Sequence, residues 1–286
     1  MITPYQAGDV LLADIRRALD EVRGVELSIW WLGQSGFLLQ WRGRHLLFDP
    51  YLSDSLTRKY AQTDKPHVRM TELAIEPLRL DFVDVVTSSH SHTDHLDADT
   101  LIPLKAANPS LEIVVPAANL ALAAERLQVP PERLTAIDEG ELVEAAGFQI
   151  RAIPSAHETV ERDEQGRCRY LGYVVRFGSW SVYHSGDTVW YEGLEDALRP
   201  WSLDLALLPI NGRAAERRVA GNLDGVEAAR LAHAAGAALV IPCHFEMFEF
   251  NTASPDEFVT ECERLGQAYQ VLRCGERRTL KPLTRS

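Results

Sequence analysis

The amino-acid sequence predicts an α/β protein in which two sheets pack face to face and helices cover their outer faces. The first part of the chain contains apolar strands joined by glycine-containing turns, then strands alternate with helices, and the second half repeats this order. Strands that are apolar on both faces need cover on both sides, which two stacked sheets with outer helices provide. No low-complexity or Pro/Ser-rich linker divides the 286 residues, so we expect a single domain over 1–286.

The first half is expected to supply one sheet with its helices. Residues 1–24 carry charges at helical spacing and predict an amphipathic surface helix, an N-terminal extension that could contact a second copy of the chain. The turns QSG and RGR separate three short apolar runs, which is typical of hairpins. The predicted elements that follow the helix are strands at 27–33, 37–41 and 45–50, a long loop at 53–76, a strand at 82–89, a helix at 97–107, a strand at 112–116, and a helix at 117–129 stopped by Pro130 and Pro131.

The second half repeats the pattern. Asp224 precedes a helical run and is a plausible N-cap, and Ser254 before Pro255 marks another helix start. The predicted elements are hairpins at 141–157 and 170–187, a strand at 204–211, a helix at 224–236, a strand at 237–244, a helix at 254–269, and a last hairpin at 270–283.

Composition excludes several classes of partner. Apolar residues make up 46% and charged residues 24%, which is typical of soluble globular proteins. The net charge of −12 repels phosphate backbones, so nucleic acid is an unlikely partner, and we expect a small-molecule substrate instead. No run of about 18 apolar residues predicts a membrane span. Four cysteines without CxxC spacing and the lack of a signal-peptide pattern favour a cytoplasmic protein.

The segment HSHTDH contains the strongest functional signal. It follows an apolar strand and places His90, His92, Asp94 and His95 within six positions. Alternate residues of an extended segment face the same way, so His90 and His92 can reach one point, while Asp94 and His95 can face a second. Imidazole and carboxylate together suit zinc, manganese or iron.

Three further donors stand at the ends of other predicted strands. They are His157 in AIPSAH, Asp187 in YHSGD and His244 in VIPCH. A lone histidine at a strand end is more often structural than ligating. Three such ends combined with the HSHTDH cluster favour one shared metal centre.

The order of these motifs resembles the metallo-β-lactamase fold superfamily over nearly the whole chain. The pieces WWLG, YHSGD and VIPCH are similar to the branch that contains the bacterial L-ascorbate-6-phosphate lactonase. The resemblance implies a four-layer αββα sandwich with two divalent ions, zinc or manganese with iron as a further candidate, at the edge between the sheets. It implies that one ion takes His90, His92 and His157, that the other takes Asp94, His95 and His244, that Asp187 bridges them, and that Asp49 supports the ligand loop.

The same resemblance implies a metal-dependent hydrolase in which a metal-bound hydroxide attacks a small lactone or ester, phosphorylated or not. Asp94 would ligate and also assist protonation of the leaving group. His184 would support the ligands, touch the substrate in a catalytic role, or be a buried hydrogen-bonded histidine. Arg213 would hold a phosphate or carboxylate, or be a solvated surface residue. The weaker substrate-binding candidates are Asn211, Tyr51, Trp190 and Glu246.

Three alternatives stay open. One is a phosphodiesterase acting on a small phosphodiester. Another is a di-iron redox protein, although such proteins commonly carry Glu at the position of His92 and need a flavin partner domain. The last is a non-catalytic metal-binding protein. His45, His67 and His233 belong to no ligand pattern and are left outside the predicted site.

Overall fold

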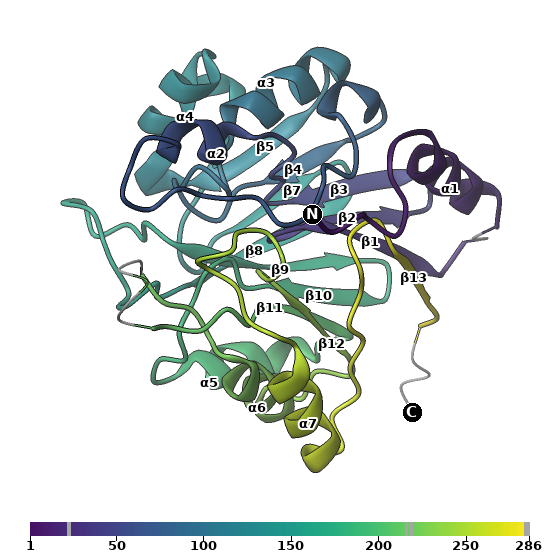
Figure 1. Cartoon of the computed structure of the whole chain (residues 1–286), viewed down its shortest axis with the longest axis vertical. Helices are drawn as coiled ribbons and strands as arrows, with labels where there is room; N and C mark the ends of the chain where they lie inside the picture. Colours follow the sequence, from purple (N-terminus) through teal and green to yellow (C-terminus); the bar gives the residue numbers. More distant parts are fainter. Residues whose placement is uncertain (22–23, 215–216, 218–219, 283–286) are drawn as a thin grey trace.

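The computed structural model describes residues 1–21, 24–214, 217 and 220–282, and its strands form two sheets (Figure 1). The seven-stranded sheet has the order β13-β1-β2-β3-β4-β5-β6, and the six-stranded sheet has the order β12-β11-β10-β9-β8-β7. The strands of the first sheet are β1 Leu27–Gly33, β2 Gly36–Trp41, β3 Arg44–Phe48, β4 Val85–Thr87, β5 Glu112–Pro116, β6 Thr135–Ile137 and β13 Arg277–Leu280. Those of the second are β7 Leu142–Ala145, β8 Phe148–Pro154, β9 Leu171–Phe177, β10 Trp180–His184, β11 Leu205–Pro209 and β12 Val240–Cys243.

Helices cover the outer face of each sheet, which gives the predicted αββα sandwich (Figure 1). Alternation along β1 shows the layering, since Ile29 belongs to the core between the sheets and Trp30 packs under the outer helices of the first sheet. The helices are α1 Gly8–Glu21, α2 Ser55–Tyr60, α3 Ala98–Ala107, α4 Leu120–Leu127, α5 Leu194–Leu198, α6 Gly225–Ala234 and α7 Asp256–Leu265, with short 3₁₀ turns at Pro77–Arg79, Ala117–Asn119, Pro131–Arg133 and Arg199–Trp201.

Helix α1 is part of the first sheet's cover. It buries Leu11 and Ile15 completely in the outer core, and its Asp14 carboxylate accepts a hydrogen bond of 2.9 Å from Trp30 Nε1. The sequence predicted a surface extension over 1–24. The helix ends at Glu21, residues 22–23 lie outside the described residues, and the inner face of the helix packs on the sheet.

Two local predictions need correction. The predicted hairpin at 270–283 is wrong, because Arg277–Leu280 pairs antiparallel with β1 and covers an edge of the first sheet. The loop predicted at 53–76 contains the short helix α2. The predicted N-cap Asp224 is confirmed, since its side chain accepts from Glu227 N at 2.8 Å in a reciprocal capping box.

The ends of five strands gather at one edge of the sandwich. Asp49 follows β3, His90 follows β4, His157 follows β8, Asp187 follows β10, and His244 follows β12. Strands that differ widely in sequence position therefore deliver their next residues to one place. Among the described residues, no helix has the length and apolar character needed to cross a membrane.

Candidate metal centre

The HSHTDH segment forms a tight turn between β4 and α3. Leu96 N donates to His92 O at 2.8 Å, and His95 N donates to the same oxygen at 3.1 Å. Arg126 of α4 also stabilises the turn, because its Nη1 donates to Ser91 O at 2.6 Å. These bonds fold the segment so that four of its side chains, His90, His92, Asp94 and His95, contribute to the groups described next.

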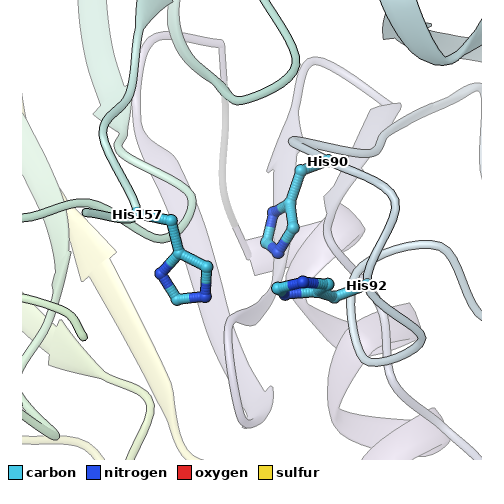
Figure 2. Close-up of side chains that lie close together, drawn as sticks. All are labelled: His90, His92 and His157. Atoms are coloured by element: carbon cyan, nitrogen blue, oxygen red, sulfur yellow. The ribbon is translucent and has the colours of Figure 1, made fainter. Parts of the chain in front are cut away.

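His90, His92 and His157 form the first group of donors. Figure 2 shows their imidazole rings facing one another, with His157 coming from the side opposite to the other two. The ring centroids of His90 and His92 are 4.6 Å apart, and those of His92 and His157 are 5.1 Å apart. One nitrogen from each ring lies within 4.8 Å of the others, a spacing that a single metal ion can span.

Asp94, His95 and His244 form the second group, again with donor atoms within 4.8 Å of one another. Asp94 Oδ2 lies 3.6 Å from His95 Nε2 and 3.7 Å from His244 Nε2. Asp187 stands between the two groups. Its Oδ1 is 3.4 Å from His95 Nε2, and its Oδ2 is 3.7 Å from His157 Nε2 and 3.4 Å from His244 Nε2.

Hydrogen bonds at Nδ1 turn three of the rings so that Nε2 faces the centre. His95 Nδ1 lies 2.6 Å from Asp49 Oδ2, and His157 Nδ1 lies 3.0 Å from the Gly221 carbonyl. His90 Nδ1 lies 3.0 Å from Ser89 Oγ, which itself donates to Asp49. Such outer contacts fix the tautomer and the ring orientation of metal-binding histidines. Asp49 therefore stands where the resemblance implies a residue that supports the ligand loop.

Charge at the centre favours a cation. Burial alone would raise the pKa of the Asp187 carboxyl, but the charges of His95 and His244 outweigh burial and hold this pKa well below its ordinary value. Burial would lower the pKa of His95, yet Asp187 and Asp94 raise it well above the usual value. Burial, with the nearby charges of His95 and His92, lowers the pKa of His90. Two carboxylates thus create a potential in which positive charge is stabilised.

Unpaired donor atoms show that these residues fit a metal ion. His90 Nε2, His95 Nε2 and Asp187 Oδ1 are buried, and none of them makes a hydrogen bond within the described part of the chain, although the last two face each other at 3.4 Å. A buried polar atom without a partner costs about 1–3 kcal/mol. Three such atoms beside one another, all of types that bind divalent ions, fit the role of ligands.

A pocket of about 700 Å³ opens over the centre. Five of the donors line it, namely His92, Asp94, His157, Asp187 and His244. The lining also contains aromatic and cationic side chains from α2, the loop after it, α4, and the segment that follows β12. These are Lys59, Tyr60, Lys65, His67, Arg126, Phe248 and Phe250.

Most of the predicted substrate residues lie outside this pocket. Arg213 and Trp190 line a smaller neighbouring hollow of about 320 Å³ that shares His157. Both Arg213 Nη atoms are engaged by the Glu227 carboxylate, at 2.6 Å for the Nη1 contact, so the guanidinium is already paired. Glu246 and the buried Tyr51 are absent from the described lining of the main pocket. Asn211 is buried and donates to Asn251, a lining residue, at 3.0 Å.

His184 lies beneath the metal centre, where a substrate cannot reach it. It is 1% exposed and stacks on Phe48 at 4.8 Å. Its Nε2 donates to Ser35 O at 2.9 Å, and its Nδ1 accepts from Gly186 N at 3.2 Å. A direct catalytic role for His184 does not agree with this position. Of the roles left open by the sequence, the structure shows the buried, hydrogen-bonded histidine.

Three residues of the site escaped the sequence analysis. His67, left outside the predicted site, lines the pocket and stacks on Tyr60 at 4.2 Å. Asn222 also lines it, and its buried Oδ1 has no partner among the described residues. Gln34 reaches the second donor group from the β1–β2 turn, with its Nε2 at 2.7 Å from Asp94 Oδ2. Only Gln34 had a local signal, as a polar residue in a turn between two buried strands.

Comparison with known proteins identifies the family. A family model described as a β-lactamase superfamily domain matches residues 28–244, which include every donor of the centre. The chain belongs to the β-lactamase superfamily. Relatives in this superfamily are similar over most of their length. A metal-dependent hydrolase of Rubrobacter xylanophilus is 28% identical over 249 residues, which are 85% of this chain and 91% of the relative. One of Methanopyrus kandleri is 28% identical over 250 residues, which are 86% and 96% of the two chains.

Solved structures share the superfamily fold. A possible metal-dependent hydrolase of Veillonella parvula superposes with a TM-score of 0.70 at 21% identity, covering 91% of this chain and all of its own. An isothiocyanate hydrolase from Delia radicum gut bacteria also has a TM-score of 0.70, at 19% identity, and covers 89% of this chain and all of its own. Sequence relatives and fold together establish a metal-dependent hydrolase of the metallo-β-lactamase type.

Proposed function

We propose that this hydrolase opens a small lactone or ester that carries an acidic group, using two divalent ions, zinc or manganese. One observation carries the proposal. Seven imidazole and carboxylate donors converge, and five of them line a pocket of about 700 Å³ whose lining also contains cationic and aromatic side chains. A pocket of that size is typical of small-molecule sites.

The cations of the pocket lining support an acidic substrate. Lys59 and Arg126 both line the pocket, although the chain as a whole has a net charge of −12. In an acidic protein, basic side chains facing a pocket raise the local concentration of anions there. Phe248 and Phe250 add apolar surface beside them, which suits the carbon skeleton of the substrate.

Divalent ions at this centre would lower the pKa of a water molecule and polarise a carbonyl. The protein's own residues would hold the reaction in place. Gly221 O and Asp49 fix the rings of His157 and His95, so that their Nε2 atoms stay aimed at one region. Asp94 faces the pocket from the second donor group, and we assign it the transfer of a proton to the leaving oxygen.

The charges around Asp94 suit an ionised proton carrier. Burial would raise the pKa of its carboxyl, but the charges of His95 and His244 outweigh burial and lower this pKa below its ordinary value. The group is therefore ionised at neutral pH and can take up a proton before passing it on. Asn222 lines the pocket, and its buried Oδ1 has no hydrogen-bond partner among the described residues, so we assign it the acceptance of a hydrogen bond from a substrate hydroxyl.

A small phosphodiester would meet the same cations, so the experiment must compare the two substrate classes. The protein is loaded separately with manganese and with zinc and is tested on sugar-phosphate lactones, on neutral lactones and on bis-p-nitrophenyl phosphate. His92→Ala serves as the blank. Turnover of phosphorylated lactones well above that of neutral lactones and of the diester is the expected result. Turnover of the diester alone would replace the lactonase proposal with a phosphodiesterase.

We also propose a cytoplasmic location. All four cysteines, Cys168, Cys243, Cys262 and Cys274, are buried as free thiols. Thiols that remain unpaired are typical of a reducing compartment.

A further inference from the structure

Gln34 belongs to a turn that is fastened to the metal centre. It is 1% exposed and has φ +49 in the β1–β2 turn, a conformation that non-glycine residues seldom adopt. Its carbonyl oxygen accepts from Trp31 Nε1 at 2.8 Å and from His244 N at 3.0 Å. The backbone of Gln34 is thus tied to the strand end that presents His244, and its side chain is held toward the donors.

The amide of Gln34 meets the atoms that face the ion. Gln34 Nε2 lies 2.7 Å from Asp94 Oδ2 and 3.0 Å from His244 Nε2. These are the same atoms that approach His95 and Asp187, since Asp94 Oδ2 lies 3.6 Å from His95 Nε2 and His244 Nε2 lies 3.4 Å from Asp187 Oδ2. A residue that only supports a ligand contacts its outer side, as Asp49 does at His95 Nδ1. Gln34 instead lies on the inner side, within the group of ligating atoms.

The spacing agrees with that of neighbouring ligands on one ion. With metal–ligand bonds of about 2.0–2.2 Å, two ligands lie about 3.0 Å apart at a right angle and about 3.5 Å apart at a tetrahedral angle. The 3.0 Å between the Gln34 amide and His244 Nε2 matches the first case, and the 3.6 and 3.7 Å from Asp94 Oδ2 to His95 Nε2 and His244 Nε2 are close to the second.

An oxygen at this point is chemically consistent with an ion, and an NH₂ group is not. His244 Nε2 has one lone pair, so it cannot accept from Gln34 and also bind a metal. Gln34 Oε1 is buried and has no hydrogen-bond partner within the described residues. A half-turn of the amide exchanges oxygen and nitrogen in the same space and directs Oε1 at the point where Asp94 and His244 converge.

We propose that Gln34 binds, through its amide oxygen, the ion that Asp94, His95 and His244 hold. The inference rests on the metal centre of the proposed function. With Gln34 as a ligand, the two metal positions differ in the number and type of their ligands. His90, His92, His157 and Asp187 offer three nitrogens and one oxygen, a set that suits four-coordinate zinc. Gln34, Asp94, His95, His244 and Asp187 offer three oxygens and two nitrogens, and this larger, harder set favours manganese or ferrous iron.

The test measures metal binding by the full chain. Gln34→Met keeps the length of the side chain and removes the oxygen, while Gln34→Glu keeps an oxygen at the same place. Gln40→Met is the matched control, because Gln40 is a buried glutamine whose Nε2 lies 3.0 Å from a histidine ring nitrogen outside the centre, that of His45. Manganese affinity and stoichiometry come from calorimetry, and the coordination number comes from the visible spectrum of the cobalt-loaded protein.

Gln34→Met should lower the affinity for one of the two manganese ions by at least roughly tenfold, which is the loss that follows removal of a residue hydrogen-bonded to a ligand. Its cobalt spectrum should intensify as the coordination number falls. Gln34→Glu should bind as tightly as the wild type or more tightly, and Gln40→Met should match the wild type. Wild-type affinities and an unchanged cobalt spectrum in Gln34→Met would overturn the proposal, as would loss of the ion in Gln34→Glu. A wild type that binds one ion would contradict the two-ion centre, and the cobalt spectra would still show whether Gln34 contacts that ion.

Discussion

His95 Nδ1 lies 2.6 Å from Asp49 Oδ2, and the side chains of both residues are fully shielded from solvent. Asp49 also accepts from Ser89 N at 2.9 Å and from Ser89 Oγ, so one carboxylate holds both His95, a proposed ligand, and the strand end that precedes the HSHTDH turn. All three contacts require an acceptor on Asp49. A change that keeps its shape but introduces an NH₂ group therefore tests this arrangement.

Asp49→Asn should lower metal affinity by about 10- to 100-fold, because the amide places a donor against at least one existing donor. Competition with a chromogenic chelator measures the affinity. Asp84→Asn is the control, since Asp84 also accepts from a backbone N–H, that of His45 at 2.8 Å, but lies away from the centre. Equal metal affinities for the two variants would contradict the role given to Asp49.

Gly186→Ala should disrupt the contacts between Ser89 and Asp49 by displacing Ser89. Gly186 has φ +59, and an added Cβ would lie 2.5 Å from Ser89 Cβ and 2.9 Å from Leu171 O. The displaced Ser89 would release Asp49, so both metal content and melting temperature should fall. Gly147→Ala is the control, because it has φ +85 with nothing within 4 Å and isolates the backbone penalty of about 1–2 kcal/mol. Full metal content in Gly186→Ala would show that Ser89 can move without affecting the ligands.

His157 and His67 both line the pocket, but we predict that replacing His157 lowers metal content and that replacing His67 affects only substrate binding. His157→Ala removes a donor and should lower the content of tightly bound metal by about one ion per chain. His67→Ala removes a ring that stacks on Tyr60 and should leave metal content unchanged while raising KM. Plasma mass spectrometry after dialysis gives the metal content. Wild-type metal content in His157→Ala would contradict its assignment as a ligand.

Lys59 and Arg213 allow a comparison of two candidate anion-binding residues. Lys59 lines the main pocket, whereas Arg213 is paired with Glu227 beside it. Lys59→Ala should raise KM for an acidic substrate by about three- to tenfold, with little effect on a neutral one. Arg213→Ala should leave KM nearly unchanged and reduce the free energy of unfolding by less than about 1 kcal/mol, because the ion pair is half exposed. A rise in KM confined to Arg213→Ala would reinstate the interpretation drawn from the sequence.

Stability should fall in mild acid because of His45. Burial lowers the pKa of this side chain to about 4, despite the opposing charge of Asp84. The unfolded chain takes up a proton near pH 6.5 and the folded chain only near pH 4, so the contribution is present above the unfolded pKa and is lost as the pH falls between these values. The loss should be about 2 kcal/mol between pH 7 and pH 5. Urea unfolding at both pH values measures it, and His45→Gln should show a smaller fall. The same fall in both proteins would assign the effect to other groups.

The residues that the structure brings together at the candidate metal centre could be predicted because their signals are local. His90, His157, Asp187 and His244 each follow a run of apolar residues, and a polar side chain at the end of a buried strand is visible in the sequence itself. The layered fold was predictable for the same reason, since strands and helices alternate with clear periodicity. The predicted hairpin at 270–283 failed because a strand–turn–strand pattern does not show which partner each strand takes.

The aromatic part of the pocket lining could not be predicted, because it is built by contacts between distant segments. His67 meets Phe248 and Phe250 with ring centroids 5.2 and 4.5 Å apart, and nothing in the local sequence of His67 indicates these partners. The pairing of Arg213 with Glu227 was not visible in the sequence, because Glu227 lies in the first turn of α6 and nothing in the local sequence indicates this contact. Tertiary pairing thus determines which basic residues are available to a ligand.

The pairing of β13 with β1 also determines when the first sheet can be completed during synthesis of the chain. Ser28 and Thr279 are register partners, so a strand near the start of the chain stays uncovered on one side until residues near 280 have left the ribosome. The second sheet, β7–β12, is complete before that moment. The nascent chain therefore carries an open apolar strand edge for most of its synthesis, a period in which chaperones and early misassembly would act on it.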